Sequence, residues 1–280
     1  MKTVTRAFIL GLVLLLGPAP ASPAPPLRIG LTAVILDDRT GLLEQWRDYL
    51  ARRLGRPVAF VQRTAYREVV ELLVTGRAEA AWLCGFPYVR FRERLRLVAV
   101  PLYRGEPLYQ SYLIVPASDT DTRSILDLNG RVFAYSDPDS NSGFLVPQYR
   151  LRTLGRDPAR FFRRTFFTWA HRKVVEAVAV GLADGGAVDG YIWESLARTE
   201  PQLTARTRVV ERSRKFGFPP IVARADADEA TVAALRRVLV GMARDPEGRQ
   251  ILARLNLDGF TPGDDTLFAD IRAMMLAVAP

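Results

Sequence analysis

From Leu27 onward, short apolar segments alternate with stretches of helical periodicity. Apolar residues at positions 42, 43, 46, 50 and 54 lie on one face of a helix, and residues 66–74 predict a second amphipathic helix that ends at Gly76. Strands are predicted around these helices, at residues 27–31, 58–61, 78–84 and 98–102. Strands separated by helices of this length pair mostly in parallel, with helices on both faces. The sequence therefore predicts an α/β fold.

The remaining elements follow a less regular pattern. Strands are predicted at residues 113–115, 132–134 and 161–167, and residues 186–193 are interpreted as a strand or turn. Helices are predicted at residues 144–154, after residue 171, and at residues 229–243, 246–255 and 266–277. We expect the last three helices to cover the first sheet.

Composition limits the class of protein. The chain has 280 residues, of which 49% are hydrophobic, and this is enough for two domains with real cores. Cys84 is the only cysteine, so no intrachain disulfide can form. The net charge of +9 favours anionic partners in general. The basic residues are scattered rather than clustered with aromatic residues, so we expect no nucleic-acid-binding surface.

The N-terminal residues have the pattern of an export signal. Lys2 and Arg6 precede an apolar run at residues 7–16, and Ala19-Pro20-Ala21 follows it. The run is too short to cross a bilayer, and the A-x-A pattern is a cleavage site. We predict a signal peptide at residues 1–21 and a mature protein located in the periplasm. No cysteine lies near the cleavage site, so a lipid anchor is not expected.

A turn rich in hydroxyl and amide groups lies between the strand at 132–134 and the helix at 144–154. Its central residues are Ser140, Asn141, Ser142 and Gly143. The first N–H groups of a helix have no intrahelical partner, and the macrodipole places partial positive charge there. Such a turn can bind a tetrahedral oxyanion. Ser and Asn are also the commonest N-caps, so local chemistry favours neither an anion site nor an ordinary cap.

The segment Asp137–Pro147 carries a longer pattern, D-P-D-S-N-S-G-F-L-V-P. It resembles the D-P-x-S-[TN]-S-G-x-x-x-P signature of the phosphonate-, phosphite- and phosphate-binding proteins of ABC transporters, the PhnD-like family. The resemblance extends over nearly all of the chain after the leader. It implies a two-lobed type II periplasmic-binding-protein fold, with two doubly wound sheets joined by a two-segment hinge. Lobe 1 is expected at residues 27–112 and 218–280, and lobe 2 at residues 113–217.

The resemblance also implies ligand contacts outside the turn. Tyr66 matches an aromatic residue at the start of the second helix, and Tyr109 matches a ligand-facing tyrosine in a P-x-Y-x-S segment. From the residues alone, Tyr109 and Tyr112 are interpreted as packing residues of a partly buried strand. His171, the only histidine, matches a family histidine at a helix start. A histidine near a helix N-terminus tends to stay neutral and can donate a hydrogen bond to an anion, although a lone histidine is more often packed or capping.

Two positions of the sequence bear on whether the ligand carries an amine. Asp189 aligns with a polar position of the family and Tyr191 with a ligand-side position. Members that bind aminoalkylphosphonates carry an acidic residue where this chain has Tyr191, and a second acidic residue where it has Pro219. If this segment is extended, Asp189 points to the opposite side. The resemblance therefore implies a ligand without an amine.

Common catalytic patterns do not occur in the sequence. There is no G-x-S-x-G, H-E-x-x-H or P-loop motif, and one histidine does not make a metal site of usual spacing. Cys84 follows a strand that opens into a binding loop in the family, but a small buried hydrophobe is its commoner role. We expect no enzymatic activity, no cofactor and no metal.

The predicted function is that of a periplasmic solute-binding protein of an ABC importer. By resemblance, it closes on a small phosphorus oxyanion (phosphite, phosphate or a short alkylphosphonate) and delivers it to an ABC permease in the inner membrane. We expect a monomer. Two alternatives stay open: the same fold as a ligand-sensing module of a signalling system, and a different ligand, such as another oxyanion or a small organic acid.

Overall fold

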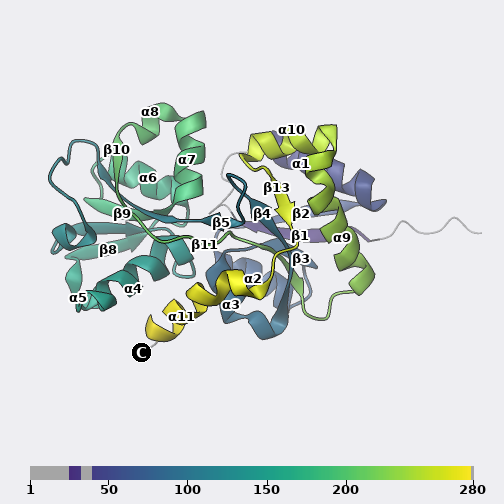
Figure 1. The fold of residues 1–280 in the computed structure, drawn as a ribbon, viewed down its shortest axis with the longest axis horizontal. Helices are drawn as coiled ribbons and strands as arrows, with labels where there is room; N and C mark the ends of the chain where they lie inside the picture. Colours follow the sequence, from purple (N-terminus) through teal and green to yellow (C-terminus); the bar gives the residue numbers. More distant parts are fainter. Residues whose placement is uncertain (1–24, 33–39, 279–280) are drawn as a thin grey trace, which may run out of the picture.

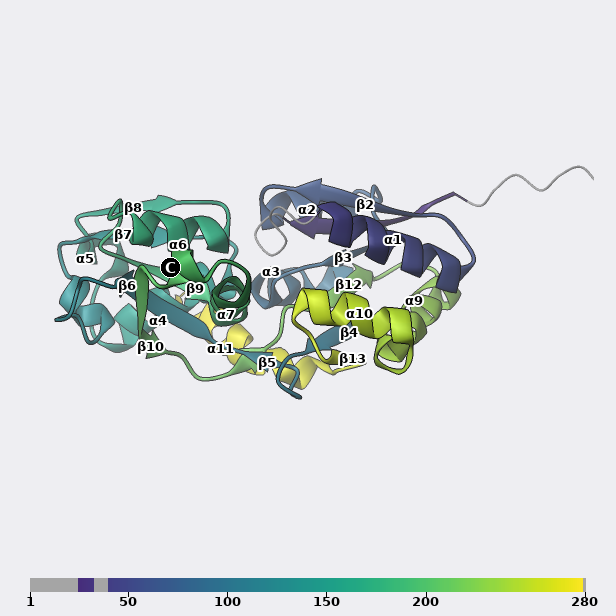
Figure 2. The same ribbon diagram turned by 90° about the horizontal axis from the view of Figure 1, so that it is seen from above.

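The computed structural model describes residues 25–32 and 40–278 of the chain. The predicted signal peptide lies outside these residues. Within them, the strands form a six-stranded sheet, a five-stranded sheet and a two-stranded ribbon. The two larger sheets lie side by side in separate lobes, with the ribbon between them (Figure 1; Figure 2). This confirms the predicted α/β architecture of two lobes. No helix in the described part of the chain is long and apolar enough to cross a membrane.

Lobe 1 is built around the six-stranded sheet, in the order β13–β4–β12–β3–β1–β2. Its strands are β1 (Leu27–Thr32), β2 (Val58–Arg63), β3 (Ala80–Trp82), β4 (Leu95–Leu102), β12 (Ile221–Arg224) and β13 (Gly259–Thr261). β1 pairs in parallel with β2 and β3, as the intervening helices predict. The late strands β12 and β13 pair antiparallel with their neighbours. The sheet is therefore mixed.

Helices cover both faces of this sheet. One face carries α1 (Thr40–Leu54), α9 (Glu229–Gly241) and α10 (Pro246–Leu255), and the other carries α2 (Tyr66–Val74) and α3 (Gly85–Arg90) (Figure 1). Trp46 of α1 packs edge-on against Trp82 of β3, with ring centroids 5.8 Å apart. This pair ties the first helix to the middle of the sheet.

Lobe 2 is built around the five-stranded sheet, in the order β10–β6–β9–β7–β8. Its strands are β6 (Ser111–Pro116), β7 (Val132–Tyr135), β8 (Arg164–Phe167), β9 (Gly185–Asp189) and β10 (Thr207–Arg212). One face carries α6 (His171–Ala179), α7 (Gly190–Thr199) and α8 (Pro201–Thr204), and the other carries α4 (Val146–Thr153) and α5 (Pro158–Phe161) (Figure 1). β7 runs parallel to β8 and β9, so the carboxyl ends of these three strands meet at one edge.

The two lobes are joined by a ribbon of two very short strands. β5 (Leu108–Tyr109) pairs antiparallel with β11 (Phe216–Gly217), where the chain crosses between the lobes and then returns. A Cβ atom at Gly217 would lie 2.6 Å from the carbonyl oxygen of Leu267, so a glycine is needed here. The lobe boundaries at residues 112 and 217 stay a prediction.

Three element predictions are wrong. Residues 190–193 begin helix α7 rather than continuing a strand or turn, because the Asp189 side chain caps the helix. Phe161 ends α5, so it does not belong to the strand predicted at 161–167. The last helix, α11 (Ala269–Val278), packs against α3 of lobe 1 and α4 of lobe 2 instead of covering the first sheet.

Candidate functional site

The turn that resembles the family signature follows β7 at the edge of lobe 2 that meets lobe 1. Asn141–Leu145 form a π-helical turn that runs directly into α4, so the helix starts three residues before the predicted Phe144. Leu145 donates its N–H to the carbonyl of Ser140 at 3.0 Å, a bond that spans five residues. Pro147 explains the wide turn, because it has no N–H and its ring would collide with a carbonyl four residues earlier in a regular helix.

The polar side chains of this turn are completely buried. Ser140, Asn141 and Ser142 each expose 0% of their surface. The Ser140 Oγ accepts a hydrogen bond from Gly143 N at 3.0 Å and is the N-cap, which leaves its own proton free to donate. Among the described residues, Ser142 Oγ, Asn141 Oδ1 and the nearby Ser136 Oγ have no hydrogen-bond partner. Buried polar atoms without partners are rare, so this turn, which we call the cradle, has the character of a binding site.

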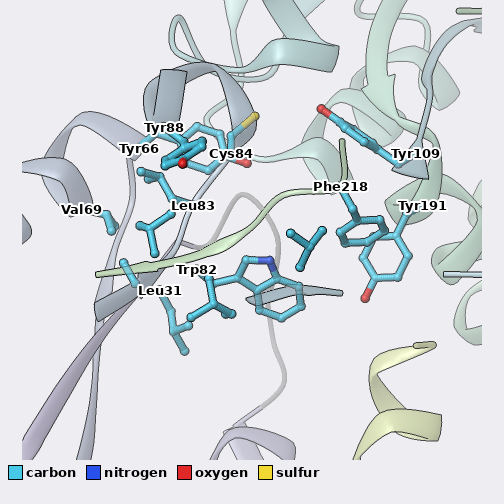
Figure 3. Close-up of a cluster of buried hydrophobic side chains, with 14 of the residues drawn as sticks. Leu31, Tyr66, Val69, Trp82, Leu83, Cys84, Tyr88, Tyr109, Tyr191 and Phe218 are labelled. Atoms are coloured by element: carbon cyan, nitrogen blue, oxygen red, sulfur yellow. The ribbon is translucent and has the colours of Figure 1, made fainter. Parts of the chain in front are cut away.

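Residues from lobe 1 and the ribbon meet the cradle. Asn141 donates from Nδ2 to the Tyr109 hydroxyl at 3.0 Å and from its backbone N–H to Cys84 Sγ at 3.3 Å. Figure 3 shows the Tyr109 hydroxyl and the Cys84 sulfur on the same side of the cluster. Burial raises the pKa of the Cys84 thiol to about 12, so the thiol stays protonated. Cys84 is thus both a buried packing residue and a neighbour of the cradle.

His171 lies beside the cradle as the first residue of α6. Its Nδ1 accepts a hydrogen bond from the backbone N–H of Asp189 at 3.1 Å, so the neutral ring carries its proton on Nε2. A Cβ atom built on Gly143 would lie 3.2 Å from His171 Cε1, which places the ring against the turn. Burial lowers the pKa of His171 to about 3. The imidazole is therefore a neutral hydrogen-bond donor.

Asp189 and Tyr191 lie at the start of α7, and only Asp189 stays near the other site residues. Its Oδ1 accepts from the backbone N–H of Tyr191 at 2.9 Å, and burial raises the pKa of this carboxyl group to about 7. The Tyr191 hydroxyl instead donates to the carbonyl of Leu255 in lobe 1. Figure 3 shows this hydroxyl pointing away from Tyr109, with the Tyr191 ring against Phe218. The structure therefore does not bring the Tyr191 side chain to the cradle.

Tyr66 approaches from lobe 1 and is held by an acidic residue of lobe 2. The backbone N–H of Tyr66 donates to Asp137 Oδ2 at 3.1 Å, and the Tyr66 side chain is buried. Burial raises the pKa of the Tyr66 hydroxyl well above its ordinary value, so it stays protonated. Asp139 forms ion pairs with Arg90 at 2.9 Å and Arg67 at 3.5 Å, both from lobe 1.

We call the contacts of Asp137 and Asp139 with lobe 1 the acidic clasp. Neither aspartate was predicted from the sequence to have a role. Both belong to the D-P-D run directly before the cradle, and that position in the signature is the signal that could have identified them.

Comparison with known proteins identifies the family to which this chain is related. Residues 37–268 match the model of a family described as ABC transporter, phosphonate, periplasmic substrate-binding protein. The chain belongs to this family. The match includes parts of both lobes and the ribbon, and among the described elements it leaves out β1 and α11.

Individual relatives agree with the family. The phosphonates-binding periplasmic protein of Escherichia coli (strain K12) is 25% identical over 250 residues, which cover 86% of this chain and 73% of that protein. The binding protein component of an ABC phosphonate transporter from Pseudomonas aeruginosa has a TM-score of 0.83 at 22% identity, covering 91% of this chain and 86% of that chain. PhnD1 of Prochlorococcus marinus (MIT 9301), solved with methylphosphonate, has a TM-score of 0.80 at 19% identity, covering 90% and 97%. The predicted type II periplasmic-binding-protein fold is confirmed.

In this member of the phosphonate-binding family, the cradle is surrounded by neutral donors. Hydroxyl groups come from Ser140, Ser142 and Tyr109, and His171 adds an uncharged N–H. The two arginines that reach the interface near the cradle, Arg67 and Arg90, are paired with Asp139. A buried anion can be stabilised by several hydrogen bonds without a buried positive charge, whose desolvation is costly. Chemically, the site suits a small, multiply hydrogen-bonded oxyanion.

Proposed function

We propose that this protein captures a small phosphorus oxyanion (phosphite, phosphate or a short alkylphosphonate) and delivers it to an ABC permease in the inner membrane. The observation that carries the proposal is the pair of buried hydroxyl groups without partners at the cradle, on Ser136 and Ser142. They lie between the lobes, beside the neutral His171. A tetrahedral oxyanion has several acceptor oxygens on one side, and the cradle offers several donors to them.

The donors can be assigned individually. Ser140 and Ser142 would donate through their hydroxyl groups, and His171 would donate through Nε2. Tyr109 accepts from Asn141 and would donate its own proton to the ligand. Tyr66 would close on the ligand from lobe 1.

Closure would be a hinge motion. Lobe 1, at residues 27–112 and 218–280, would rotate against lobe 2, at residues 113–217, about the ribbon of β5 and β11. Each of these strands has two residues, so few backbone hydrogen bonds resist the motion. The acidic clasp would then form only in the closed state. Two relatives support the ligand class by their descriptions, one as a phosphonates-binding protein and one in complex with methylphosphonate.

A thermal-shift screen tests the ligand. The mature protein is heated with phosphate, phosphite, methylphosphonate, 2-aminoethylphosphonate or sulfate. A true ligand at about a hundred times its Kd should stabilise the fold by roughly 2.7 kcal/mol. If no phosphorus oxyanion raises the melting temperature, or sulfate raises it most, the proposal is wrong.

The same screen tests the preference for an amine-free ligand. An ammonium group in a closed cleft needs a carboxylate or several acceptors, and one neutral amide oxygen such as Asn141 Oδ1 does not replace them. The Tyr191 hydroxyl is engaged by Leu255, Pro219 has no side-chain acceptor, and Asp189 caps α7 through Oδ1. Methylphosphonate should bind at least about tenfold more tightly than 2-aminoethylphosphonate, because a charge-assisted hydrogen bond is worth roughly 1.5–3 kcal/mol. Tighter binding of the amine in calorimetric titrations would contradict this.

Export is tested separately. If residues 1–21 are a cleaved signal peptide, mass spectrometry of the protein recovered from the periplasm should find a chain that begins at Ser22. An intact Met1 in a soluble cytoplasmic pool would contradict the periplasmic location.

A further inference from the structure

A cavity lies where the chain returns from lobe 2 to lobe 1. Its volume is about 590 Å³, and its walls are α4, the segment from the end of β10 to the start of β11, and α11. We call it the hinge slot. It is lined by Val146, Tyr149, Arg150, Thr153, Glu211, Arg212, Ser213, Arg214, Phe216 and Met274. None of these residues belongs to the cradle, and the volume is within the usual range for small-molecule sites.

One face of α4 forms a wall of the hinge slot. Residues 146, 149, 150 and 153 are spaced by three and four positions, so their side chains lie on the same side of the helix. α4 and α11 pack against each other below the crossing segments (Figure 1). The slot is therefore enclosed by a helix of lobe 2, by the segment that connects the lobes, and by the C-terminal helix.

The floor of the hinge slot is apolar. Phe216 and Met274 are buried, with 2% and 1% of their surface exposed, and both line the cavity. Val146 and Tyr149 add apolar surface from α4. Such a floor favours an aromatic or branched apolar group, because its burial removes apolar surface from water.

Two arginines at the rim of the slot have weakly held acidic partners. Arg150 lies 3.9 Å from Glu211, and Arg214 lies 3.2 Å from Asp270. Both arginine side chains are about half exposed, and exposed ion pairs of this kind contribute little free energy. An anionic group of a ligand can therefore replace either partner.

The other arginine of the slot is turned toward a different neighbour. Arg212 holds its guanidinium over the Tyr112 ring, 4.9 Å from the centroid. Arg214 holds its guanidinium over the Phe216 ring, 5.4 Å from the centroid, so this cation lies directly above the apolar floor of the slot. Arg150 lines the slot from α4.

We propose that the hinge slot binds a small amphiphilic anion. Its aromatic or branched apolar body would lie on Phe216 and Met274, and its carboxylate, sulfonate or phosphate group would lie between Arg150 and Arg214. The cradle differs in offering hydroxyl and imidazole donors and no arginine side chain. Since the slot is walled by α4 and by the segment that joins the lobes, its occupant contacts parts that move relative to each other when the lobes open.

The probe for this site is 1-anilinonaphthalene-8-sulfonate, which combines an aromatic body with one sulfonate group. It is titrated into the mature protein without any phosphorus oxyanion, and its fluorescence is recorded. We expect saturable binding at one site per chain. Arg150→Ala and Arg214→Ala should each weaken this binding about two- to fivefold, as for the loss of an exposed charge.

Arg152→Ala is the matched control, because Arg152 is an exposed arginine on the same helix but does not line the slot. It should leave the affinity unchanged. Thr153→Trp tests the cavity itself, because an indole ring at this position fills the slot without removing a charge. It should abolish saturable binding while the melting temperature stays within a few degrees.

Two results would overturn the proposal. One is the absence of saturable binding by the unmodified protein. The other is binding that survives Thr153→Trp or that falls equally with Arg152→Ala, because the probe would then be attracted to the basic surface in general.

Discussion

The serines of the cradle have different neighbours although they are two residues apart. Ser140 caps the helix through its oxygen, which accepts from Gly143, and keeps its proton for a second bond. Ser142 holds its backbone carbonyl against the hydroxyl of Ser111 at 2.6 Å, but its own hydroxyl has no partner among the described residues. The stability of the fold therefore depends more on Ser140, and ligand binding can be tested most cleanly at Ser142.

Ser142→Ala should reduce affinity without reducing stability. Removing a donor to an anion costs roughly 1.5–3 kcal/mol, so Kd should rise about ten- to a hundredfold. Ser140→Ala should show a similar loss of affinity and also lower the free energy of unfolding by about 0.5–2 kcal/mol, because the cap is lost. Calorimetry and urea unfolding measure both quantities, with the exposed Ser118→Ala as control. An unchanged Kd for Ser142→Ala would remove this residue from the site.

The imidazole of His171 should stay neutral at every physiological pH. Its pKa is lowered to about 3 by burial, while an unfolded histidine titrates near 6.5. The unfolded chain therefore binds a proton that the folded chain does not, and His171 makes the folded state less stable as pH falls from 6.5 toward 3. Since the protein has one histidine, its imidazole NMR signals are unambiguous and should not shift between pH 5 and 8. A titration centred near pH 6.5 would show that the ring is exposed.

At the scale of residues, the sequence predicted which side chains belong near the turn better than it predicted where each side chain points. Ser140, Ser142, Tyr109 and His171 converge around one turn, as the resemblance implied, and their ligand roles stay predictions. Tyr191 was assigned to the ligand because it aligns with a ligand-side position of the family, in a segment that was interpreted as a strand or turn. In a helix its side chain points instead to Leu255, and this depends on a neighbouring lobe that local sequence does not reveal.

Among the elements, the π-helical turn at Asn141–Leu145 has the largest influence on the geometry of the site. Proline at position 147 prevents a regular first turn, and Gly143 allows the turn to pack tightly against Ser136 and His171. A Cβ atom at Gly143 would lie 1.9 Å from Ser136 Oγ and 2.8 Å from Ser136 Cβ. This glycine is therefore required by close approach rather than by an unusual backbone angle.

Gly143→Ala should damage both folding and binding. Forcing a methyl group into this contact costs about 1–3 kcal/mol of stability, and it displaces the two neighbouring side chains from the cradle. Urea unfolding and calorimetric titration measure the two effects. Gly241→Ala is the control, because a Cβ atom there meets nothing within 4 Å. Wild-type affinity in Gly143→Ala would show that Ser136 and His171 do not need their present positions.

An element was predicted correctly where its apolar pattern is regular and was missed where the pattern is weak. α2 was predicted at residues 66–74 because its apolar stripe is regular and a glycine follows it. α7 was missed because Gly190, Tyr191, Ile192 and Trp193 favour strands or turns by propensity. Its signal was the Asp189 cap, which is visible in sequence but becomes decisive only when the helix packs against β9.

At the scale of the whole molecule, several contacts join the two lobes. The acidic clasp joins lobe 2 to α2 and α3. In addition, Tyr103 of lobe 1 donates to Glu194 of α7 in lobe 2. α11 contacts both lobes as well. The sequence predicted that two lobes exist. The contacts between them depend on how the lobes are placed relative to each other, and the periodicity of the sequence does not indicate this.

Asp139→Asn should shift the ligand-free protein toward an open form. The carboxylate is 6% exposed, but Arg67 and Arg90 are 69% and 51% exposed, so each pair contributes at most about 1 kcal/mol. We expect a larger radius of gyration in small-angle X-ray scattering and up to about a tenfold loss of ligand affinity, mainly through faster release. Asp121→Asn, an exposed change outside the clasp, is the control. An unchanged radius and affinity would mean that the clasp does not hold the lobes together.

The position of Cys84 has a practical consequence for kinetics. The thiol is the only one in the chain, it is 1% exposed, and it touches the backbone N–H of Asn141 from the opposite lobe. Under the proposed hinge motion, a thiol reagent would reach it only after the lobes separate, so the rate of labelling would measure how often the molecule opens. Saturating ligand would lower the labelling rate by the same factor by which it suppresses opening. The native Cys84 would thus report the opening rate, and no further cysteine has to be engineered into the protein.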